Sequence, residues 1–316
     1  MSEADRQARP GPRRGLALGQ RSAALLMRLF MQVSRACGRR FSSRFAGDFL
    51  RECGPFVPEH RLGLANLEAA YPDMAPEERA RILSGVWDSL ARVMVEYAFM
   101  PDLVDAFDPA RPTGGVIEHV GLDHALRLRD SGKAAIVFGA HIGNWELPAA
   151  LGARIGFPIT ALYRPPNNPF IAAEMERRRA FIDKLVASGR GAALQIRAAL
   201  QKGRNVAIIV DQRVDQGEDI LFFGRPARSN PVVGMLARHF DVPVIGARAV
   251  RLPGGRFRLE VTPPLDLPRD AGGRVDAPGA NLIVHGLVER WVRETPDQWL
   301  WLHDRWRRHA AALRKR

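Results

Sequence analysis

The fold is decided by the stretch Ile136-Val-Phe-Gly-Ala-His-Ile-Gly-Asn-Trp-Glu146. It opens with an apolar run over 135–138, which is typical of a buried β-strand. A glycine ends the run and His141 follows at once, so we expect the histidine at the carboxyl end of a strand. Ligands and catalysis in α/β sheets concentrate at that edge. The residues that follow predict a helix over 145–152, with Glu146 in its first turn.

His141 and Glu146 are five positions apart, and on one continuous helix they would point about 140° away from each other. A strand, a glycine-containing turn and a helix start can instead bring them together. A carboxylate bonded to one imidazole nitrogen fixes the tautomer and raises the basicity of the other nitrogen. His141 would then be a general base for an alcohol. The alternative is a structural histidine and a glutamate that favours the helix dipole, and the spacing alone leaves both open.

Apolar strands and amphipathic helices alternate through the rest of the chain. This pattern predicts an α/β fold, with a central largely parallel or mixed sheet flanked by helices. We expect further strands over 159–162, 205–210, 243–250 and 257–261. We expect helices over 122–131, 169–186, 192–202, 231–240 and 276–294.

The chain is expected to form one folded unit behind an N-terminal extension. Residues 1–14 are polar and basic, which is typical of a disordered tail. Residues 39–316 are interpreted as a single α/β domain, with a helical layer over 39–121 and an α/β core over 122–316. Glu96 falls in an apolar helical segment of that layer and therefore needs a buried partner.

Residues 15–38 predict an amphipathic helix. Arg21, Arg28 and Arg35 recur every seven residues, so they fall on one stripe of an otherwise largely apolar segment. No uncharged run reaches the roughly 18 residues that span a bilayer. We therefore expect a helix that lies in the membrane interface, with a helix packed on its own domain as the alternative.

The net charge of +13 and the pI near 11.0 indicate a partner that is anionic. Nucleic acid, an anionic membrane and an acidic carrier protein all fit. All but four of the 47 basic residues are arginine, which suits bidentate phosphate contacts, although a codon bias explains the same ratio. The two cysteines indicate neither a disulfide framework nor a metal cluster, and we expect no metal and no cofactor.

Two polar motifs follow predicted strands. Arg164 comes after the strand at 159–162 and should lie at the same sheet edge as His141. It could bind a phosphate or steady an oxyanion, or it could be one more surface arginine. Asp211, followed by Gln212, also ends a strand and could bind an acceptor, hold Arg164 or cap the loop.

Two aromatic motifs lie later in the chain. The stretch Phe222-Phe-Gly-Arg-Pro226 predicts a turn whose aromatic residues belong to the core. Trp299, Trp301 and Trp306 stand among arginines, which suits a membrane interface or a stacking platform for single-stranded nucleic acid. His303 in the same segment is interpreted as structural.

The stretch from Gly139 to Glu146 resembles the H-x4-D/E signature of glycerolipid-type acyltransferases. It is most similar to the branch of bacterial lipid A late acyltransferases, the lauroyl and myristoyl transferases. The resemblance covers roughly residues 55 to 310, and other pieces match in order. These are Arg61 with Ala65-Asn66-Leu67, the Glu96 region, Tyr163-Arg164-Pro165, Asp211-Gln212, Phe222 to Pro226, and Trp299-Leu-Trp-Leu-His303.

The resemblance implies an O-acyltransferase at the cytoplasmic face of the cell inner membrane. An acyl carrier protein would donate the acyl chain, and a hydroxyl of a phosphorylated glycolipid, a lipid A precursor, would accept it. His141 would be the general base, oriented by Glu146. The residues implied in acceptor binding are Arg164, Asp211, Gln212, Gly224 and Arg225.

Two other functions remain open at this point. The same fold could act on another membrane lipid, such as a glycerolipid or a mannolipid. A basic nucleic-acid-binding protein would also explain the charge, although no specific nucleic-acid motif is present. A serine-centred nucleophile elbow is absent, which favours direct attack by the acceptor over a covalent acyl-enzyme.

Overall fold

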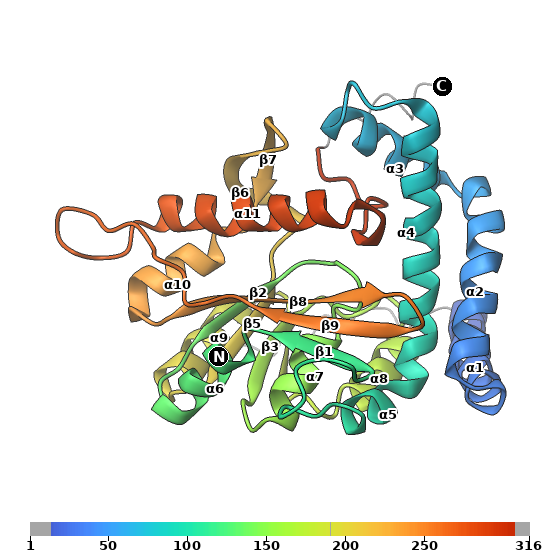
Figure 1. Ribbon diagram of the computed structural model, residues 1–316, viewed down its shortest axis with the longest axis horizontal. Helices are drawn as coiled ribbons and strands as arrows, with labels where there is room; N and C mark the ends of the chain where they lie inside the picture. Colours follow the sequence, from blue (N-terminus) through green and yellow to red (C-terminus); the bar gives the residue numbers. More distant parts are fainter. Residues whose placement is uncertain (1–13, 190, 307–316) are drawn as a thin grey trace, which may run out of the picture.

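A mixed seven-stranded sheet forms the centre of the computed structural model, which describes residues 14–189 and 191–306. Its strands are β1 (Ile117–Val120), β2 (Ile136–Gly139), β3 (Ile159–Tyr163), β4 (Lys184–Ala187), β5 (Asn205–Ile209), β8 (Val244–Leu252) and β9 (Arg256–Val261). The order is β1-β9-β8-β2-β5-β3-β4, and every neighbouring pair is parallel except β8 and β9. The predicted α/β class with a largely parallel sheet is therefore confirmed (Figure 1).

Side chains of the strands alternate between two cores on opposite faces of the sheet. Ile136 and Phe138 belong to one core, with residues of α9, α10 and α11, whereas Val137 belongs to the other, with residues of α5, α6 and α7. Figure 1 shows α10 and α11 on one side of the sheet and α6 and α7 on the other. The helices are α5 (Met100–Asp105), α6 (Leu122–Ser131), α7 (Leu147–Arg154), α9 (Ala192–Gln201), α10 (Val232–Phe240) and α11 (Ala277–Glu294).

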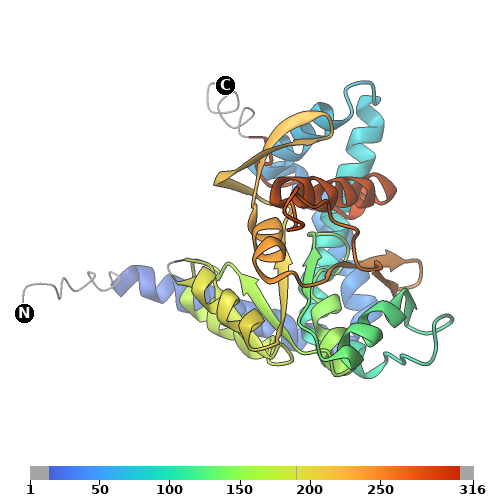
Figure 2. The ribbon, with the colours of Figure 1, turned by 90° about the vertical axis from the view of Figure 1, so that its left-hand side faces the viewer.

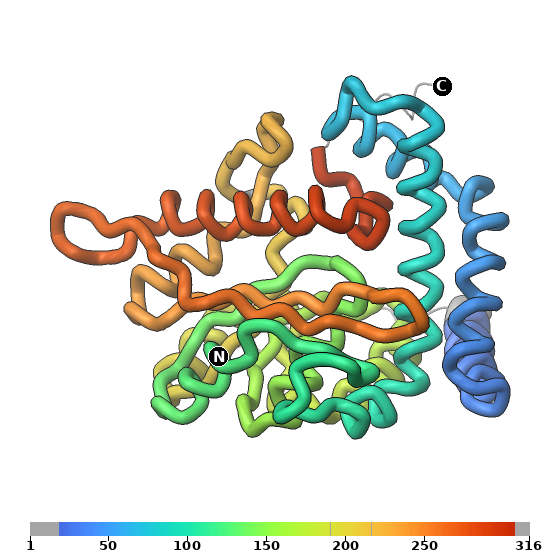
Figure 3. Tube along the Cα trace, viewed as in Figure 1, coloured from blue at the N-terminus to red at the C-terminus, as the bar shows by residue number. Residues whose placement is uncertain are grey.

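An N-terminal helical layer stands at the carboxyl edge of the sheet. It consists of α1 (Arg14–Cys37), α2 (Arg39–Cys53), α3 (Pro58–Ala70) and α4 (Pro76–Glu96). α4 lies beside the turn between β8 and β9, with α2 and α1 on its outer side (Figures 1 and 3). The predicted tail over 1–14 lies almost entirely outside the described residues.

The arginine stripe of α1 turns toward the protein. Arg28 donates to Glu174 at 2.8 Å, Arg35 donates to Asp102 at 2.6 Å, and Arg21 lies over an aromatic ring at the start of α8 (Pro169–Arg178). Figure 2 shows α1 alongside α8, with its first turns projecting from the body. The apolar side of α1 is left exposed. Within residues 14–189 and 191–306, no helix is both long enough and apolar enough to cross a bilayer.

The predicted long helix over 169–186 is wrong. α8 ends at Arg178, and residues 184–187 form the edge strand β4, which pairs in parallel with β3. The apolar residues that continued the helical period are used instead for strand pairing. Two smaller differences are that 101–121 contains α5 and β1, and that the helix after β2 begins at Leu147, two residues later than predicted.

The predicted aromatic turn is a hairpin of β6 (Arg213–Phe222) and β7 (Arg225–Ser229). Phe223 and Gly224 both have positive φ, 54° and 68°, as a two-residue type I′ turn requires. Phe222 and Phe223 are buried, as predicted. Their rings contact Trp299, Trp301 and Trp306, which are buried too. The predicted roles of these tryptophans at a membrane interface or as a stacking platform for nucleic acid are therefore wrong.

Candidate active site

His141 and Asp211 meet at the carboxyl ends of β2 and β5. The parallel register sets Gly139 beside Ile209, and the two polar residues each lie two positions further on. Asp211 Oδ1 is 2.8 Å from His141 Nδ1, and Asp211 Oδ2 accepts from the backbone N–H of His141 at 2.7 Å. The carboxylate is fully buried, whereas 18% of the His141 side chain is exposed. Because a carboxylate only accepts, Nδ1 carries the proton and Nε2 is left as the basic nitrogen.

A third residue holds this pair in place. Trp299 Nε1 donates to Asp211 Oδ2 at 2.8 Å, and the Trp299 side chain is fully buried. The next residue, Leu300, donates its backbone N–H to the carbonyl of His141 at 3.1 Å. The C-terminal segment therefore fixes both the carboxylate and the loop that carries the imidazole. Buried donors that satisfy a carboxylate in this way also keep it ionised.

The charges around His141 favour its protonated form. Burial acts to lower the pKa of His141, but the charge and hydrogen bond of Asp211, with the charge of Glu146, outweigh burial and raise this pKa above its ordinary value. The pKa of Asp211 is held well below its usual range: burial acts to raise it, and the charge and hydrogen bond of His141 overcome that effect. A more basic Nε2 is a better proton acceptor, provided that it is neutral when substrate binds.

The predicted hydrogen bond between Glu146 and His141 is wrong, because Glu146 has other partners. Glu146 accepts from Arg179 Nε at 2.9 Å and from Arg179 Nη2 at 2.5 Å, and it also accepts from the hydroxyl of Tyr97. The imidazole is oriented by Asp211 instead. Glu146 is buried, and its charge compensates the largely buried Arg179. Its effect on His141 is through space.

The loop between His141 and Glu146 has one enforced shape. Gly143 has φ +57°, and a Cβ there would lie 2.1 Å from the carbonyl oxygen of Ala249. Asn144 follows it, donating its backbone N–H to the same Ala249 carbonyl at 3.0 Å and its side chain to Glu96 at 2.8 Å. The partner that Glu96 was predicted to need is thus present in Asn144, together with Arg251 at 2.8 Å.

An apolar cavity of about 100 Å³ lies next to this loop. Ala140, Trp145 and Glu146 bound it on the side of His141, and Arg179 and Tyr163 add polar groups. The rest of its wall is mostly aliphatic and comes from β2, β3, β5, β8, α7 and the chain around β4, including Ala149, Ile159, Ala161, Leu162, Ile182 and Leu185. Phe138 and Arg248 are the aromatic and the charged residue of this part of the wall. Hydrocarbon fits such a lining.

The other predicted site residues are more dispersed. Arg164 follows β3 at the expected sheet edge and is exposed, with no ion pair to any carboxylate of the described chain. Gln212 is exposed directly after Asp211. Gly224 and Arg225 lie at the turn of the β6–β7 hairpin, where they line a separate hollow of about 620 Å³. The wall of that hollow includes neither His141 nor the residues that bound the apolar cavity.

Sequence reasoning missed Arg179 and Tyr97 and gave Asp211 a different role. A signal for Asp211 exists, since it follows a β-branched run just as His141 does. This signal becomes interpretable only when the strand order is known, because Asp211 meets His141 only if β2 and β5 are neighbours in the sheet. No local pattern points to Arg179, which stood inside a predicted helix.

Comparison with known proteins gives the family of the chain. The sequence pattern of the family described as bacterial lipid A biosynthesis acyltransferase matches residues 20–308. The chain belongs to that family. It is accordingly an O-acyltransferase, and the family acts in lipid A biosynthesis.

Curated relatives with named activities are similar over most of their length. The chain is 27% identical over 264 residues to the lipid A biosynthesis palmitoleoyltransferase of Escherichia coli (strain K12), covering 80% of each chain. It is equally similar to a lipid A biosynthesis acyltransferase of Shigella flexneri. It is 25% identical over 259 residues to the lipid A biosynthesis lauroyltransferase of Escherichia coli (strain K12), covering 77% of each chain.

Proposed function

We propose that this lipid A acyltransferase moves a fatty acyl chain from an acyl carrier protein thioester to a hydroxyl of a phosphorylated lipid A precursor. The observation that carries the mechanism is the double hold of Asp211 on His141, at the backbone N–H and at Nδ1. This arrangement leaves Nε2 as a base on the loop that borders the apolar cavity. The family membership supports the class of reaction, and the net charge of +13 supports acidic partners.

The proposed reaction is a single displacement. Nε2 of His141 accepts the proton of the acceptor hydroxyl as its oxygen attacks the carbonyl carbon of the thioester. The tetrahedral intermediate then collapses, the carbon–sulfur bond breaks, and the thiolate takes the proton back from the imidazolium. The products are the ester and the free thiol of the carrier. Asp211 stabilises the imidazolium while it exists.

Glu146 acts in this proposal through Arg179 and not through the imidazole. The carboxylate holds the guanidinium at the wall of the apolar cavity, where Arg179 faces the loop of His141. A fixed cation next to the reacting carbonyl would stabilise the oxyanion that forms there, and water exclusion strengthens such an interaction. The apolar cavity would hold part of the acyl chain.

The face made by α1 and α2 supports attachment to the cytoplasmic surface of an anionic membrane. Leu25 and Leu29 of α1 are 66% and 52% exposed, and Phe41, Phe45 and Phe49 of α2 are 56–64% exposed. The polar side of α1 is turned inward to ion pairs, so this apolar face has no covering in the described chain. Exposed apolar groups beside arginines are typical of helices that lie in the membrane interface.

The nucleic-acid alternative rested on the net charge of +13 and on the C-terminal tryptophans, and it loses the second of these observations. Trp299, Trp301 and Trp306 are buried against the β6–β7 hairpin, so their rings cannot stack on bases. Another membrane lipid as acceptor is distinguished by assay. Purified protein is incubated with an acyl carrier protein thioester and either a lipid A precursor or a glycerolipid, and the ester product is identified by mass spectrometry. Transfer to the glycerolipid alone would contradict the proposed acceptor.

A further inference from the structure

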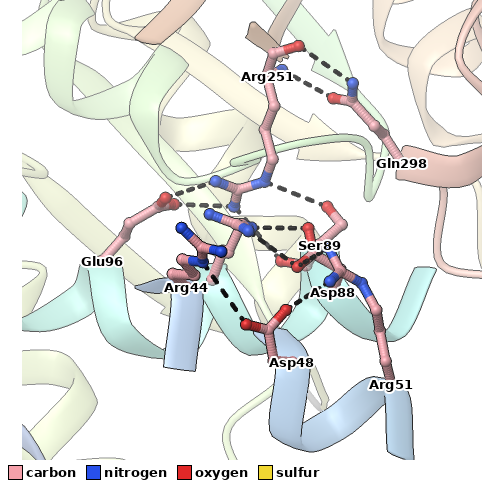
Figure 4. Close-up of polar contacts among 9 residues, drawn as sticks. Arg44, Asp48, Arg51, Asp88, Ser89, Glu96, Arg251 and Gln298 are labelled. Atoms are coloured by element: carbon pink, nitrogen blue, oxygen red, sulfur yellow. Dashed lines mark hydrogen bonds and ion pairs between the residues drawn. The ribbon is translucent and has the colours of Figure 1, made fainter. Parts of the chain in front are cut away.

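A polar groove of about 720 Å³ lies between α2, α4 and the β8–β9 turn, apart from the apolar cavity. Seven arginines and four carboxylates line it, leaving three positive charges in excess. Three of the four carboxylates are occupied (Figure 4). Asp88 is bonded by Arg51 and Arg92, Asp48 by Arg51, and Glu96 by Arg251.

Two arginines at the start of α2 are left without a carboxylate partner among the described residues. Arg39 donates to the carbonyl oxygen of Gly255 at 2.7 Å, and Arg40 is exposed at the groove wall. Burial, and the charges of Arg40 and Arg251, lower the pKa of Arg39 against the opposing charge of Glu96. Arginine stays charged under such conditions, so these cations repel one another unless an anion lies between them.

The same end of α2 offers uncharged donors. Its N-cap residue is Gly38, which makes no side-chain cap hydrogen bond, so the first-turn amides have no side-chain acceptor there. One turn later, the hydroxyl of Ser43 is buried at the groove wall and has no hydrogen-bond partner within the described chain. An unpartnered, buried hydroxyl and two guanidinium groups at one wall are a phosphate-binding combination, next to the start of a helix.

The neighbouring face of α2 indicates what carries the phosphate. Arg40 and Arg44 line the groove, whereas Phe41 and Phe45 are exposed and stack at 6.3 Å between ring centroids. One helix therefore presents a cationic side and an apolar side next to each other. A lipid with a phosphate in the groove and its hydrocarbon against the phenylalanines satisfies both sides. A free anion or a phosphorylated protein would leave the phenylalanines in water.

We propose that this groove binds the phosphate of a phosphorylated lipid. The proposal deepens the proposed function, because the acceptor is a phosphorylated lipid, and it also fits the headgroup of a membrane lipid. Arg251 in the groove shares Glu96 with Asn144 of the catalytic loop. An occupied groove is thus two hydrogen bonds away from the loop that shapes the active site.

The test uses water-soluble short-chain phosphatidic acid as the probe. Its binding to the full-length protein is measured by calorimetry, next to inorganic phosphate and short-chain phosphatidylcholine. The variant Arg40→Glu/Arg44→Glu should bind phosphatidic acid about tenfold more weakly or worse, since charge-assisted hydrogen bonds are lost and replaced by repulsion. The matched control Arg154→Glu/Arg290→Glu, on α7 and α11, makes the same change of charge at exposed sites outside the groove and should keep the affinity.

Three results would overturn the proposal. One is equal loss in the groove variant and the control. Another is inorganic phosphate binding as tightly as phosphatidic acid. The third is a groove variant that loses affinity for acyl carrier protein but keeps it for phosphatidic acid.

Acyl transfer measured on the same samples separates this proposal from the proposed function. Transfer by the wild type, with lipid binding indifferent to Arg40 and Arg44, refutes the groove alone. Arginine-dependent lipid binding without any transfer refutes the proposed function alone.

Discussion

Asp211 is the residue on which the chemistry of His141 depends. It accepts from both the backbone and the ring of the histidine, so one buried carboxylate sets the position, the tautomer and the charge of the base. The raised pKa of His141 has a consequence for pH. The base is active only when neutral, so turnover should fall as the pH is lowered through this raised pKa.

Asp211→Asn tests this role. Removing the carboxylate charge leaves burial as the main influence on His141, so its pKa should drop, and the acid limb of the pH–rate profile should move to lower pH. The maximal rate should fall about 10²–10⁴-fold, because the amide no longer secures the tautomer or stabilises the imidazolium. Trp299→Phe keeps the carboxylate and should leave the acid limb close to its original position. A profile of Asp211→Asn that keeps its acid limb would contradict the assignment.

Glu146→Gln separates the two carboxylates near His141. Glu146 compensates Arg179, so the amide leaves a largely buried guanidinium without a counter-charge, which costs about 3–5 kcal/mol when a buried pair is broken. We expect a lower midpoint in denaturant and a loss of turnover. The acid limb should move less than in Asp211→Asn, because Glu146 is the smaller influence on the pKa of His141. A larger shift in Glu146→Gln would return the orienting role to Glu146.

For single residues, the sequence predicts the candidate site residues better than it predicts the contacts between them. His141, Glu146 and Asp211 were all singled out, but their pairing depends on strand order, which no local pattern encodes. Arg164 was predicted at the sheet edge of His141, and the resemblance implied that Arg164 and Arg225 both bind the acceptor. The structure leaves Arg164 exposed and places Arg225 in a separate hollow, because the hairpin that carries Arg225 packs on the tryptophan cluster.

The loop between β2 and α7 is the element that holds the site together. It is fixed by backbone bonds to β8 and to the segment around Trp299, and by the side chain of Asn144. Its shape depends on Gly143, whose positive φ and close approach to Ala249 exclude any side chain.

Gly143→Ala should disturb this loop measurably. The new Cβ would meet a backbone oxygen at 2.1 Å in addition to an unfavourable φ, and strained positions of this kind cost about 1–3 kcal/mol each. Gly203→Ala is the matched control, since Gly203 has φ +72° and open space around it. The free energy of unfolding, measured by chemical denaturation, and the turnover rate should both fall more in Gly143→Ala than in Gly203→Ala. Equal effects of the two substitutions would show that the loop tolerates displacement.

Elements with a strong period were predicted well, whereas paired edge segments were not. The strands at β2, β5 and β8 are apolar runs that any sheet would bury. β4 is an edge strand of mixed polarity, and its residues continue the helical period of α8, so only pairing with β3 identifies it. The burial of the tryptophans was not predicted either, because the hairpin that covers them is remote in sequence.

On the scale of the whole molecule, one side carries both apolar and cationic groups. α1 and α2 line that side, and the groove beside α2 is rich in arginine. The sequence indicated an interfacial helix over 15–38, and the structure extends the apolar face to α2. The orientation of α1 could not be predicted, because the acidic partners of its arginines lie on α8 and α5.

Phe45→Ser/Phe49→Ser should weaken attachment to anionic vesicles. Full burial of one large apolar side chain is worth about 1.5–3 kcal/mol, so partition should fall about tenfold or more. Leu194→Ser/Leu282→Ser removes two apolar side chains that are equally exposed, on α9 and α11, and should leave partition unchanged. Sedimentation with vesicles at low and high salt measures both. Attachment that disappears in high salt alone and ignores the phenylalanines would be electrostatic only.

The most direct test of the account is acyl transfer by His141→Ala, measured with an acyl carrier protein thioester and a phosphorylated lipid A precursor. Mass spectrometry follows both the ester product and the intact protein. We predict that the free energy of unfolding of the variant stays within about 1 kcal/mol of the wild-type value. Its turnover should fall about 10²–10⁴-fold, and no acylated protein should accumulate. Full turnover in His141→Ala, or an acyl group trapped covalently on any residue, would contradict direct transfer by the His141–Asp211 pair.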